Sequence, residues 1–375
     1  MKPLSLYFHI PFCVRKCAYC DFASYPGREG EMRQYFDKLL EEIEHWSGLT
    51  DSGPLSERFF IRTIFIGGGT PTIVDAGHIA EIIDRGRSIA PVAGDIEITL
   101  EGNPGTLMPE KLIAYRKAGI NRLSLGAQSF DDSLLRSLGR IHSAAQIGEA
   151  VDMAREAGFE NINLDLMYAL PGQSMAQWRD TLDAAIEIGV PHISAYSLIV
   201  EDGTPMAARV ASGEAVLPDD DTVNAMQREA IERLSGAGYG RYEISNYAKP
   251  GFECRHNLTY WQRGDYLGLG CAAHSMLDNC RFCNPDSLDE YLAGARMLDL
   301  QRLDERDILE ETVMLGTRMS QGIDRSPFKN VDSRRLDRLI ASGLIEMDER
   351  YLRLTTRGME LQNAVILELL EVLGC

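Results

Sequence analysis

The sequence predicts an α/β protein whose main unit is an open, partial (β/α)6 barrel, followed by an α/β extension and a small winged-helix-like domain. Three observations predict this fold. Apolar, strand-like runs alternate with amphipathic helical stretches about six times before residue 200. The helical stretches have recognisable residues at their ends. Six such units are two short of a complete eight-unit barrel, so we expect the barrel to stay open along one side.

Each strand of the barrel can be assigned a range. Alternating strands and helices at this spacing predict parallel pairing with right-handed crossovers. The apolar runs that we assign to strands are Leu4–Ile10, Thr63–Ile66, Ile96–Leu100, Arg122–Leu125, Asn161–Met167 and His192–Val200.

The helices between these strands have readable boundaries. Proline favours the first turn of a helix, glycine often follows its last residue, and a Ser with a Gln three residues later forms a capping box. These signals are Pro109 with Gly119, Ser143 with Gln146 and Gly158, and Ser174 with Gln177 and Gly189.

The chain of 375 residues is too long for a typical single domain. We predict a barrel over residues 1–215, an extension over 216–302 and a winged-helix-like domain over 303–375. The last part should contain a helical stretch from about Leu303, then Arg334–Ala341, then Leu344–Thr355 with a polar Asp-Glu-Arg turn, and a final helix through Leu370. Residues 331–357 hold six arginines against five acidic side chains, so this domain lacks a strongly basic face and a packing or lid role is favoured over DNA binding.

The charge of the chain narrows the possible partners. Thirty-eight basic and fifty-six acidic residues give a net charge of -18, which disfavours binding to nucleic acid or anionic lipid. No apolar run is long enough to cross a membrane, although peripheral contact stays open. The N-terminal residues lead directly into a cysteine motif and leave no room for a signal peptide, so we expect a cytoplasmic protein.

Three of the eight cysteines form the most informative motif. Cys13, Cys17 and Cys20 have C-x3-C-x2-C spacing on a loop that follows the first strand. In a reducing compartment, clustered cysteines indicate metal or redox ligands. Three thiolates can hold three irons of a four-iron cluster and leave the fourth iron open, whereas a structural zinc site needs four ligands. A zinc knuckle or three incidental buried thiols are the alternatives.

Polar or glycine residues follow several of the predicted strands. Chemistry in barrel folds occurs at the carboxyl ends of the strands, so these residues are candidates for a site. Each has a structural alternative, because the glycines could form a tight turn and the others could be caps or solvated groups. The candidates are Gly68, Gly69 and Thr70 in Gly-Gly-Gly-Thr-Pro-Thr, then Glu101, Gln128, Arg140 and Asp165.

The cysteine spacing, with Tyr19 before the last cysteine, resembles the radical S-adenosylmethionine (SAM) superfamily. In that superfamily a [4Fe-4S] cluster binds SAM through its open iron and cleaves it to a 5'-deoxyadenosyl radical. The wider set of motifs is similar over the whole chain to the coproporphyrinogen dehydrogenase (HemN-like) branch. Ala169 stands where many relatives have glycine. The resemblance implies that SAM is bound by Tyr7, Tyr19, Gly68, Gly69, Thr70, Glu101, Gln128, Arg140 and Asp165.

Two departures from the dehydrogenase matter. Phe22 stands where that enzyme has a further cysteine, and only twelve residues precede Cys13, whereas the enzyme has an N-terminal extension. Whether the chain is an enzyme is therefore undecided. Oxidative decarboxylation of coproporphyrinogen III stays open as the alternative function.

A second motif lies at Cys254-Arg255-His256-Asn257-Leu258-Thr259-Tyr260-Trp261. Its His-Asn-x-x-Tyr-Trp pattern is similar to that of the HemW haem chaperones of the same branch. The resemblance implies that His256 contacts haem, which suits an imidazole beside aromatic side chains. A buried histidine with hydrogen-bonded ring nitrogens is the alternative. His9 and His274 are possible second ligands.

The resemblance also implies partners. These are haem, an apo-haemoprotein that receives it, and an electron donor of the flavodoxin or ferredoxin type. Arg15 and Lys16 could dock an acidic donor or could be solvated loop charges. Cys271 and the Cys280-x-x-Cys283 pair could be a second metal site, a redox pair or unrelated thiols.

Overall fold

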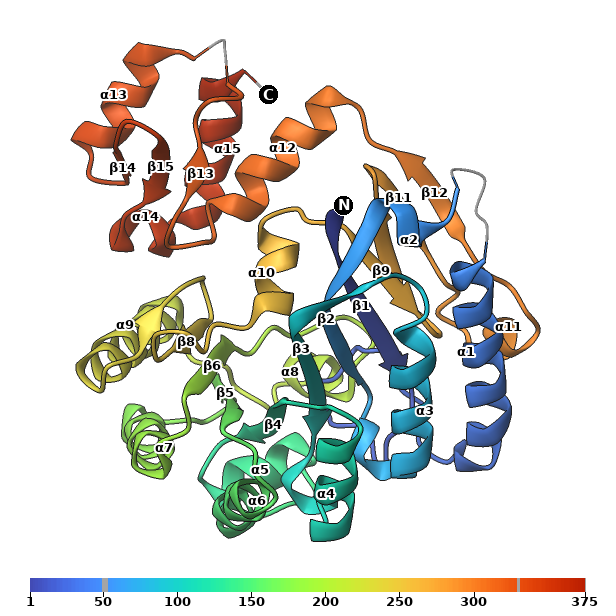
Figure 1. Cartoon of the computed structure of the whole chain (residues 1–375). Coiled ribbons are helices and arrows are strands. Elements are labelled where there is room, and N and C mark those ends of the chain that lie inside the picture. The colour runs from blue at the N-terminus through green and yellow to red at the C-terminus, as the bar shows by residue number, and fades with distance from the viewer. Residues whose placement is uncertain (49–52, 329–330, 375) are drawn as a thin grey trace.

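The computed structural model describes residues 1–48, 53–328 and 331–374. Its main feature is a twelve-stranded sheet with the order β12-β11-β10-β9-β1-β2-β3-β4-β5-β6-β8-β7 (Figure 1). Strands β1 to β6 are parallel and stand in sequence order. Because β1 pairs with β9, and β6 pairs with β8, the parallel part does not close into a full barrel. The prediction of an open, six-unit barrel is confirmed.

The strands of the barrel are separated by helices in the predicted alternation. The strands are β1 (Lys2–Ile10), β2 (Phe59–Gly68), β3 (Val92–Gly102), β4 (Arg122–Gln128), β5 (Asn161–Tyr168) and β6 (His192–Ser197). The helices that lie between them are α1 (Met32–Ser47), α2 (Leu55–Arg58), α3 (Ala76–Gly86), α4 (Pro109–Lys117), α5 (Asp132–Leu138), α6 (Ala144–Glu156) and α7 (Met175–Ile188).

The predicted helix ends are present. Pro109 is the first residue of α4, and both capping boxes form, at Ser143 for α6 and at Ser174 for α7. Gly189 ends α7 with φ 70°, a left-handed conformation that glycine adopts at little cost. Local side-chain chemistry thus specifies where these helices begin and end.

One predicted strand is too long. We expected a strand over His192–Val200, but β6 ends at Ser197. Its neighbour β5 ends at Tyr168, where Ala169 turns the chain with φ 59°. Residues 198–200 therefore have no parallel partner to continue the ladder. Conversely, β2 and β3 extend beyond the predicted cores Thr63–Ile66 and Ile96–Leu100.

The sheet continues past the barrel on both sides, which the sequence did not reveal. β9 lies parallel to β1, and the antiparallel strands β10 to β12 follow it outward. Leu267 and Leu269 of β9 belong to the same buried core as the barrel strands. The elements after β6 are α8 (Pro205–Ala211), α9 (Asp220–Gly236), β7 (Gly240–Arg241), β8 (Asn246–Ala248), α10 (Arg255–Trp261), β9 (Tyr266–Leu269), β10 (His274–Leu277), β11 (Cys280–Cys283), α11 (Leu288–Leu292) and β12 (Leu298–Arg302).

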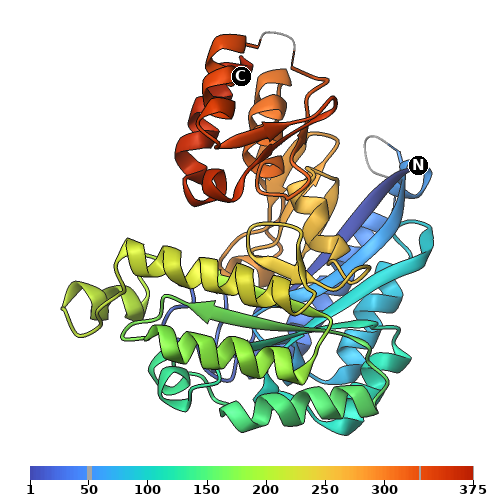
Figure 2. The same cartoon turned by 90° about the vertical axis from the view of Figure 1, so that its left-hand side faces the viewer.

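The C-terminal part builds a separate small core beside the barrel (Figure 2). Its sheet has the order β13-β15-β14, and the antiparallel β14–β15 pair lies in the stretch Leu344–Thr355, on either side of the polar turn. The boundaries proposed at residues 215 and 302 stay predictions. The elements are α12 (Glu305–Gly316), β13 (Ile323–Asp324), α13 (Ser333–Ala341), β14 (Ile345–Met347), β15 (Tyr351–Leu354), α14 (Thr356–Glu360) and α15 (Gln362–Leu373).

Backbone and side-chain contacts join this part to the barrel. Ser320 donates its backbone N–H to the carbonyl of Tyr242 at 3.0 Å, and the Arg318 guanidinium lies 5.7 Å from the centre of the Trp261 ring. None of the helices in the described ranges is long and apolar enough to cross a membrane.

Candidate functional site

The cysteine loop follows β1 and is held by the barrel around it. Cys13 is 7% exposed, whereas Cys17 and Cys20 are half-buried. The backbone N–H of Ala18 donates to the carbonyl of Leu138 at 2.9 Å, and the N–H of Met206 donates to the carbonyl of Ala18 at 2.8 Å. The loop is therefore anchored on α5 and α8 at the carboxyl edge of the sheet.

The glycine loop after β2 packs against the cysteine loop. Gly69 donates its N–H to the carbonyl of Ile10 at 2.8 Å, and Thr70 donates to the carbonyl of Phe12 at 2.7 Å. A Cβ atom at Gly69 would lie 2.5 Å from the Phe12 oxygen, so only glycine fits. The Thr70 hydroxyl lies 3.4 Å from the Cys13 sulfur. The glycines thus bring the backbones of two functional loops into contact.

Two carboxyl groups lie behind this loop. Glu101 accepts a hydrogen bond from the Gly68 N–H at 3.2 Å. Burial, with a further contribution from Asp165, raises the pKa of Glu101 to about 8. Burial also raises the pKa of Asp165, although Ser124 and Asn163 donate to it at 3.1 and 2.8 Å. A cation bound beside them would favour the ionised form of both carboxyl groups.

Arg140 connects the cysteine loop with β4. Its Nη1 donates to the Cys17 sulfur at 3.4 Å, and its Nη2 donates to the Gly126 carbonyl. Its Nε is buried and has no hydrogen-bond partner. Gln128 lies in the same region, because a Cβ built on Gly126 would be 2.9 Å from both the Arg140 Nη2 and the Gln128 Nε2. Arg140 therefore keeps one donor for a ligand.

The two tyrosines complete this group. The Tyr7 hydroxyl lies 2.9 Å from His9 Nδ1, and burial followed by the charge of Glu101 raises its pKa. Burial raises the pKa of Tyr19, which lies near Arg140 and Cys17. The structure thus gathers at one edge of the sheet the residues that the sequence suggested for the cluster and SAM: Tyr7, Cys13, Cys17, Tyr19, Cys20, Gly68, Gly69, Thr70, Glu101, Gln128, Arg140 and Asp165.

The donor set suits a cluster with separate iron atoms. Within the described ranges, no three His, Cys, Asp or Glu side chains converge closely enough to share one metal ion. A four-iron cluster distributes its thiolates over different irons, so its ligands do not meet at one point. Burial raises the pKa of both Cys13 and Cys20. The charge of the nearby Cys17 thiolate raises both pKa values further.

His256 lies elsewhere, on α10. This helix contacts Ser5 of β1, Thr63 of β2 and Glu97 of β3, well before these strands reach the cysteine loop (Figure 1). His256 is 1% exposed. Burial, followed by the charge of Arg122, lowers its pKa to about 3. The histidine is therefore neutral.

Both ring nitrogens of His256 have partners. The Thr63 hydroxyl donates its proton to the Ser5 hydroxyl at 2.7 Å. The Thr63 oxygen therefore accepts a hydrogen bond from His256 Nδ1, which lies 2.8 Å away. Nε2 then accepts from the Tyr260 hydroxyl at 2.9 Å. No ring nitrogen is free to ligate iron in this arrangement. The assignment of His256 to haem stays a prediction, and the geometry agrees better with a buried, hydrogen-bonded histidine.

Sequence reasoning missed the residues that hold α10. Glu97, 3% exposed, accepts hydrogen bonds from the backbone N–H groups of Arg255 and His256 at 3.1 and 3.0 Å. Arg122, 1% exposed, lies among Glu97, Cys254 and Tyr242. The available signal was a charged residue within an otherwise apolar strand, which is costly to bury without a partner.

Among the residues that the structure describes, Cys254, Cys271, Cys280 and Cys283 are free thiols. Cys280 and Cys283 are three residues apart in β11, and side chains at that spacing point to opposite faces of a strand. This geometry favours unrelated thiols over a Cys280–Cys283 redox pair. Cys271 is buried and its thiol lies 3.3 Å from the carbonyl of Pro285.

Comparison with known protein families agrees with this site. Residues 7–185 match the family described as the radical SAM superfamily, and residues 303–361 match the HemN C-terminal domain. The first match runs from Tyr7 in β1 to Ala185 in α7 and includes the cysteine loop, the glycine loop and both carboxyl groups.

The relatives cover nearly the whole chain. The heme chaperone HemW of Mycobacterium tuberculosis is 36% identical over 377 residues, which is 98% of this chain and 95% of that protein. The heme chaperone HemW of Escherichia coli K12 is 36% identical over 384 residues, or 98% of each chain. This chain belongs to the HemW family. HemW of Bacillus subtilis is 35% identical over 375 residues, covering 96% of this chain and 97% of its own.

A solved structure supports the architecture of this HemW-family protein. The radical SAM enzyme coproporphyrinogen III oxidase (HemN) of Escherichia coli superposes with a TM-score of 0.82 and 26% identity. The match covers 99% of this chain and 90% of that one. The HemW-family fold described here is thus the radical SAM barrel with its C-terminal additions.

Proposed function

We propose that this protein is a haem chaperone that binds a [4Fe-4S] cluster, SAM and haem and delivers haem to apo-haemoproteins. The observation that carries the proposal is 36% identity over 98% of the chain to proteins named heme chaperone HemW. The clustering of the predicted site residues at the carboxyl edge of the barrel supports it, because that edge is where barrel proteins bind their ligands.

Cys13, Cys17 and Cys20 would hold the cluster, which when bound supplies an electron and an open iron for SAM. Arg140 would place a positive charge beside the Cys17 thiolate. Its unpartnered Nε would remain available to a carboxylate of SAM. The packed glycine loop would hold the cysteine loop in place by its two backbone hydrogen bonds.

Glu101 and Asp165 would bind the positively charged parts of SAM. Burial raises the pKa of both carboxyl groups, and the charge of Asp165 raises that of Glu101 further. A cation between them would offset these effects and favour the ionised forms. Tyr7 and Tyr19 would flank the bound SAM, since both are half-buried.

The remaining expectations belong to the same proposal. The chain would act in the cytoplasm and receive electrons from a flavodoxin- or ferredoxin-type protein. Arg15 and Lys16 are exposed between the cluster ligands, and the exposed Phe22 lies at the end of the same loop. These side chains would offer a basic and apolar surface to an acidic electron donor.

The first test is chemical analysis of the anaerobically reconstituted protein. We expect about four irons and four acid-labile sulfides per chain, following the cluster composition. Cys17→Ala should lose the cluster signal and SAM cleavage while circular dichroism stays unchanged. Cys280→Ala, also half-buried but outside the loop, is the matched control and should behave like the parent. Zinc in place of iron would overturn the proposal.

The second test concerns haem. Titration with haem should saturate near one equivalent per chain, and mixing the loaded protein with an apo-globin should move the Soret band to that of the globin. Absence of saturable binding would remove the chaperone function. The alternative, oxidative decarboxylation of coproporphyrinogen III, predicts carbon dioxide release with SAM and a reductant, and the HemN structure is the observation that favours it.

A further inference from the structure

A chain of hydrogen bonds connects Asp165, one of the residues assigned above to SAM, with the start of α10. It begins at the Asp165 carboxylate in β5 and ends at the backbone N–H of Cys254, the N-cap residue of α10. The side chains between these ends are Asn163, His192 and Tyr242. Asn163 and His192 are 1% and 0% exposed, so the links nearest Asp165 are closed to water.

The strand register brings the first members of the chain together. Asn163 pairs with His192 in the parallel ladder of β5 and β6, so both side chains point to the same face of the sheet. Asp165 lies two residues after Asn163 and points to that face as well. The Asn163 Nδ2 donates to the Asp165 carboxylate at 2.8 Å, and the Asn163 Oδ1 lies 2.6 Å from His192 Nδ1. Regular strand geometry thus builds this part of the chain.

The end of the chain at α10 fixes the direction of its hydrogen bonds. The Cys254 backbone N–H can only donate, and it donates to the Tyr242 hydroxyl oxygen at 3.3 Å. The Tyr242 proton then points to His192 Nε2, 2.8 Å away. Burial, followed by the charge of Arg122, lowers the pKa of His192 well below its usual value, so the ring is neutral and holds one proton. That proton is on Nδ1, which donates to Asn163 Oδ1.

His192 in turn fixes the amide of Asn163. His192 Nδ1 and the Ser194 hydroxyl, at 2.6 and 3.2 Å, both donate to the Asn163 oxygen. The amide nitrogen therefore faces the other way, toward Asp165 and the Ser124 oxygen, which lies 2.7 Å from it. A reversed amide would place its oxygen against an ionised carboxylate, which can only accept. His192 thus determines that Asn163 presents its donor to the carboxylate.

We propose that His192 and Tyr242 are positioning residues for SAM binding. They orient Asn163, and through it the carboxylate of Asp165, and they join this carboxylate to α10. The inference rests on the proposed function, in which Asp165 binds SAM. SAM binding and the placement of α10 are then coupled, and such coupling acts equally in both directions. The His-Asn-x-x-Tyr-Trp motif on α10 therefore responds to SAM.

The first experiment measures SAM affinity by equilibrium dialysis of the anaerobically reconstituted full-length protein, without reductant so that SAM is not cleaved. Asn163→Leu and His192→Leu should each weaken SAM binding about ten-fold, because each removes buried hydrogen bonds that orient Asp165. His192→Asn should restore most of the affinity, since its amide nitrogen can replace Nδ1 as the donor. No restoration by His192→Asn would show that the ring only fills space.

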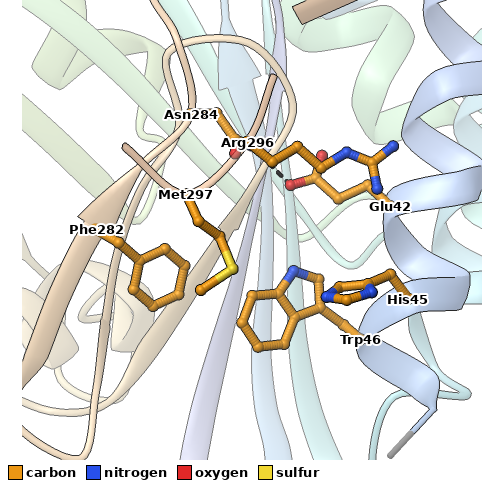
Figure 3. Close-up of a pocket in the computed structure, with 7 residues that line it drawn as sticks. All are labelled: Glu42, His45, Trp46, Phe282, Asn284, Arg296 and Met297. Atoms are coloured by element: carbon orange, nitrogen blue, oxygen red, sulfur yellow. Dashed lines mark hydrogen bonds between the residues drawn. The ribbon is translucent and has the colours of Figure 1, made fainter. Parts of the chain in front are cut away.

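The matched control is Asn284→Leu. Asn284 is 3% exposed and donates its Nδ2 to another buried carboxylate, that of Glu42, at 2.7 Å. Figure 3 shows this pair in the pocket between α1 and β11, whereas Asp165 belongs to β5. Asn284→Leu should bind SAM like the parent, although it loses the same kind of hydrogen bond. Equal losses of SAM affinity in Asn163→Leu and Asn284→Leu would indicate general destabilisation and overturn the inference.

Hydrogen exchange tests the link to α10. Tyr242→Phe removes only the hydroxyl group that joins His192 to the Cys254 N–H. In the parent, SAM should slow exchange of the α10 amides by about five-fold or more. This effect should disappear in Tyr242→Phe. If SAM binds to the parent and leaves exchange in α10 unchanged, the coupling is wrong.

The results separate this inference from the proposed function. If the parent binds SAM, and the Asn163 and His192 variants bind it equally well, the inference fails and the proposed function stands. If the reconstituted parent binds no SAM, the proposed function fails and the inference fails with it. Circular dichroism and iron content check that each variant is folded and holds its cluster.

Discussion

Two residues at the carboxyl edge of the sheet adopt a conformation that favours glycine. Gln128, at the end of β4, has φ 64°, and Ala169, directly after β5, has φ 59°. A left-handed conformation costs a residue with a Cβ about 1–2 kcal/mol. Gln128 is expected to bind SAM, and strained backbone of this kind is common at functional sites. At Ala169 the positive φ explains why glycine would fit this position.

This geometry predicts the effect of Ala169→Gly. Relief of the backbone strain should offset the loss of a buried methyl group, so the free energy of unfolding should change by less than about 1 kcal/mol. Ala195→Gly is the matched control, because Ala195 is also 4% exposed but lies within β6. It should destabilise the protein by about 1–2 kcal/mol, because the strand loses both a buried methyl group and conformational restriction. Equal losses in urea unfolding at both sites would contradict the argument.

The raised pKa of Glu101 predicts a pH effect on the cluster-free protein. In the unfolded chain this carboxyl group should titrate near 4.5, and in the folded chain at about 8. Between these values the folded state holds a proton that the unfolded state has released, so stability falls as the pH rises. Glu101→Gln should remove this loss. Its melting temperature should therefore exceed that of the parent more at pH 8 than at pH 5.

Asp131 provides a control, because its contribution to stability changes with pH in the opposite direction. Hydrogen bonds from Ser133 and Gln177 lower its pKa to about 2, so its contribution to stability is lost on acidification. Asp131→Asn should lower the free energy of unfolding more at pH 7 than at pH 3. A Glu101→Gln variant that tracks the parent at every pH would show that Glu101 is ionised in the folded state.

At the scale of elements, α10 depends on a carboxylate from another strand. Cys254 stands at the N-cap of α10 but makes no side-chain capping hydrogen bond. Glu97 of β3 replaces it by accepting from the first two N–H groups of the helix, where negative charge is favourable. The His-Asn-x-x-Tyr-Trp motif is thus positioned by a residue more than 150 positions away.

Glu97→Ala should destabilise the protein by about 3 kcal/mol. The change removes two charge-assisted hydrogen bonds and leaves Arg122 buried beside fewer acceptors. The control is Asp95→Ala, since Asp95 pairs with Arg255 at the surface and its side chain is 74% exposed. That change should cost less than about 0.5 kcal/mol. Chemical unfolding of both variants measures the difference, and similar costs would refute the capping role.

At the scale of the whole molecule, the chain has two main cores. One joins the barrel, α9 and β9, and the other consists of residues from Val313 to Leu373. Cores without shared buried residues can open independently. The contacts between the two parts include the Arg263–Glu311 pair at 2.8 Å and the Arg228–Glu360 pair at 3.1 Å.

Leu369→Ala should therefore destabilise the C-terminal part alone. Leu369 is fully buried, and such truncations cost about 2–5 kcal/mol. Hydrogen exchange should accelerate in α12 to α15 while β1 to β6 keep their protection. Leu182→Ala, equally buried on α7, should show the reverse pattern. Faster exchange throughout the chain in both variants would indicate one cooperative unit.

Much of the barrel and its site could be predicted from local patterns. The strand and helix alternation, the capping boxes at Ser143 and Ser174 and the C-x3-C-x2-C spacing each act over a few residues. The carboxyl-edge rule then places Glu101 and Gln128 near the cysteines, because parallel strands all end at the same edge. These features follow from short-range geometry and repeat from unit to unit.

Other features were decided only by the tertiary structure. The pairing of β9 with β1, the capping of α10 by Glu97 and the enclosure of His256 all join residues far apart in the chain. Whether a histidine is a free ligand or a satisfied core residue depends on what surrounds its two nitrogens. By itself, the sequence determined the barrel, the cysteine motif and the family, because each is a local or repeated pattern. Only packing decided which side chains stay available, since burial and hydrogen bonding are properties of the assembled fold.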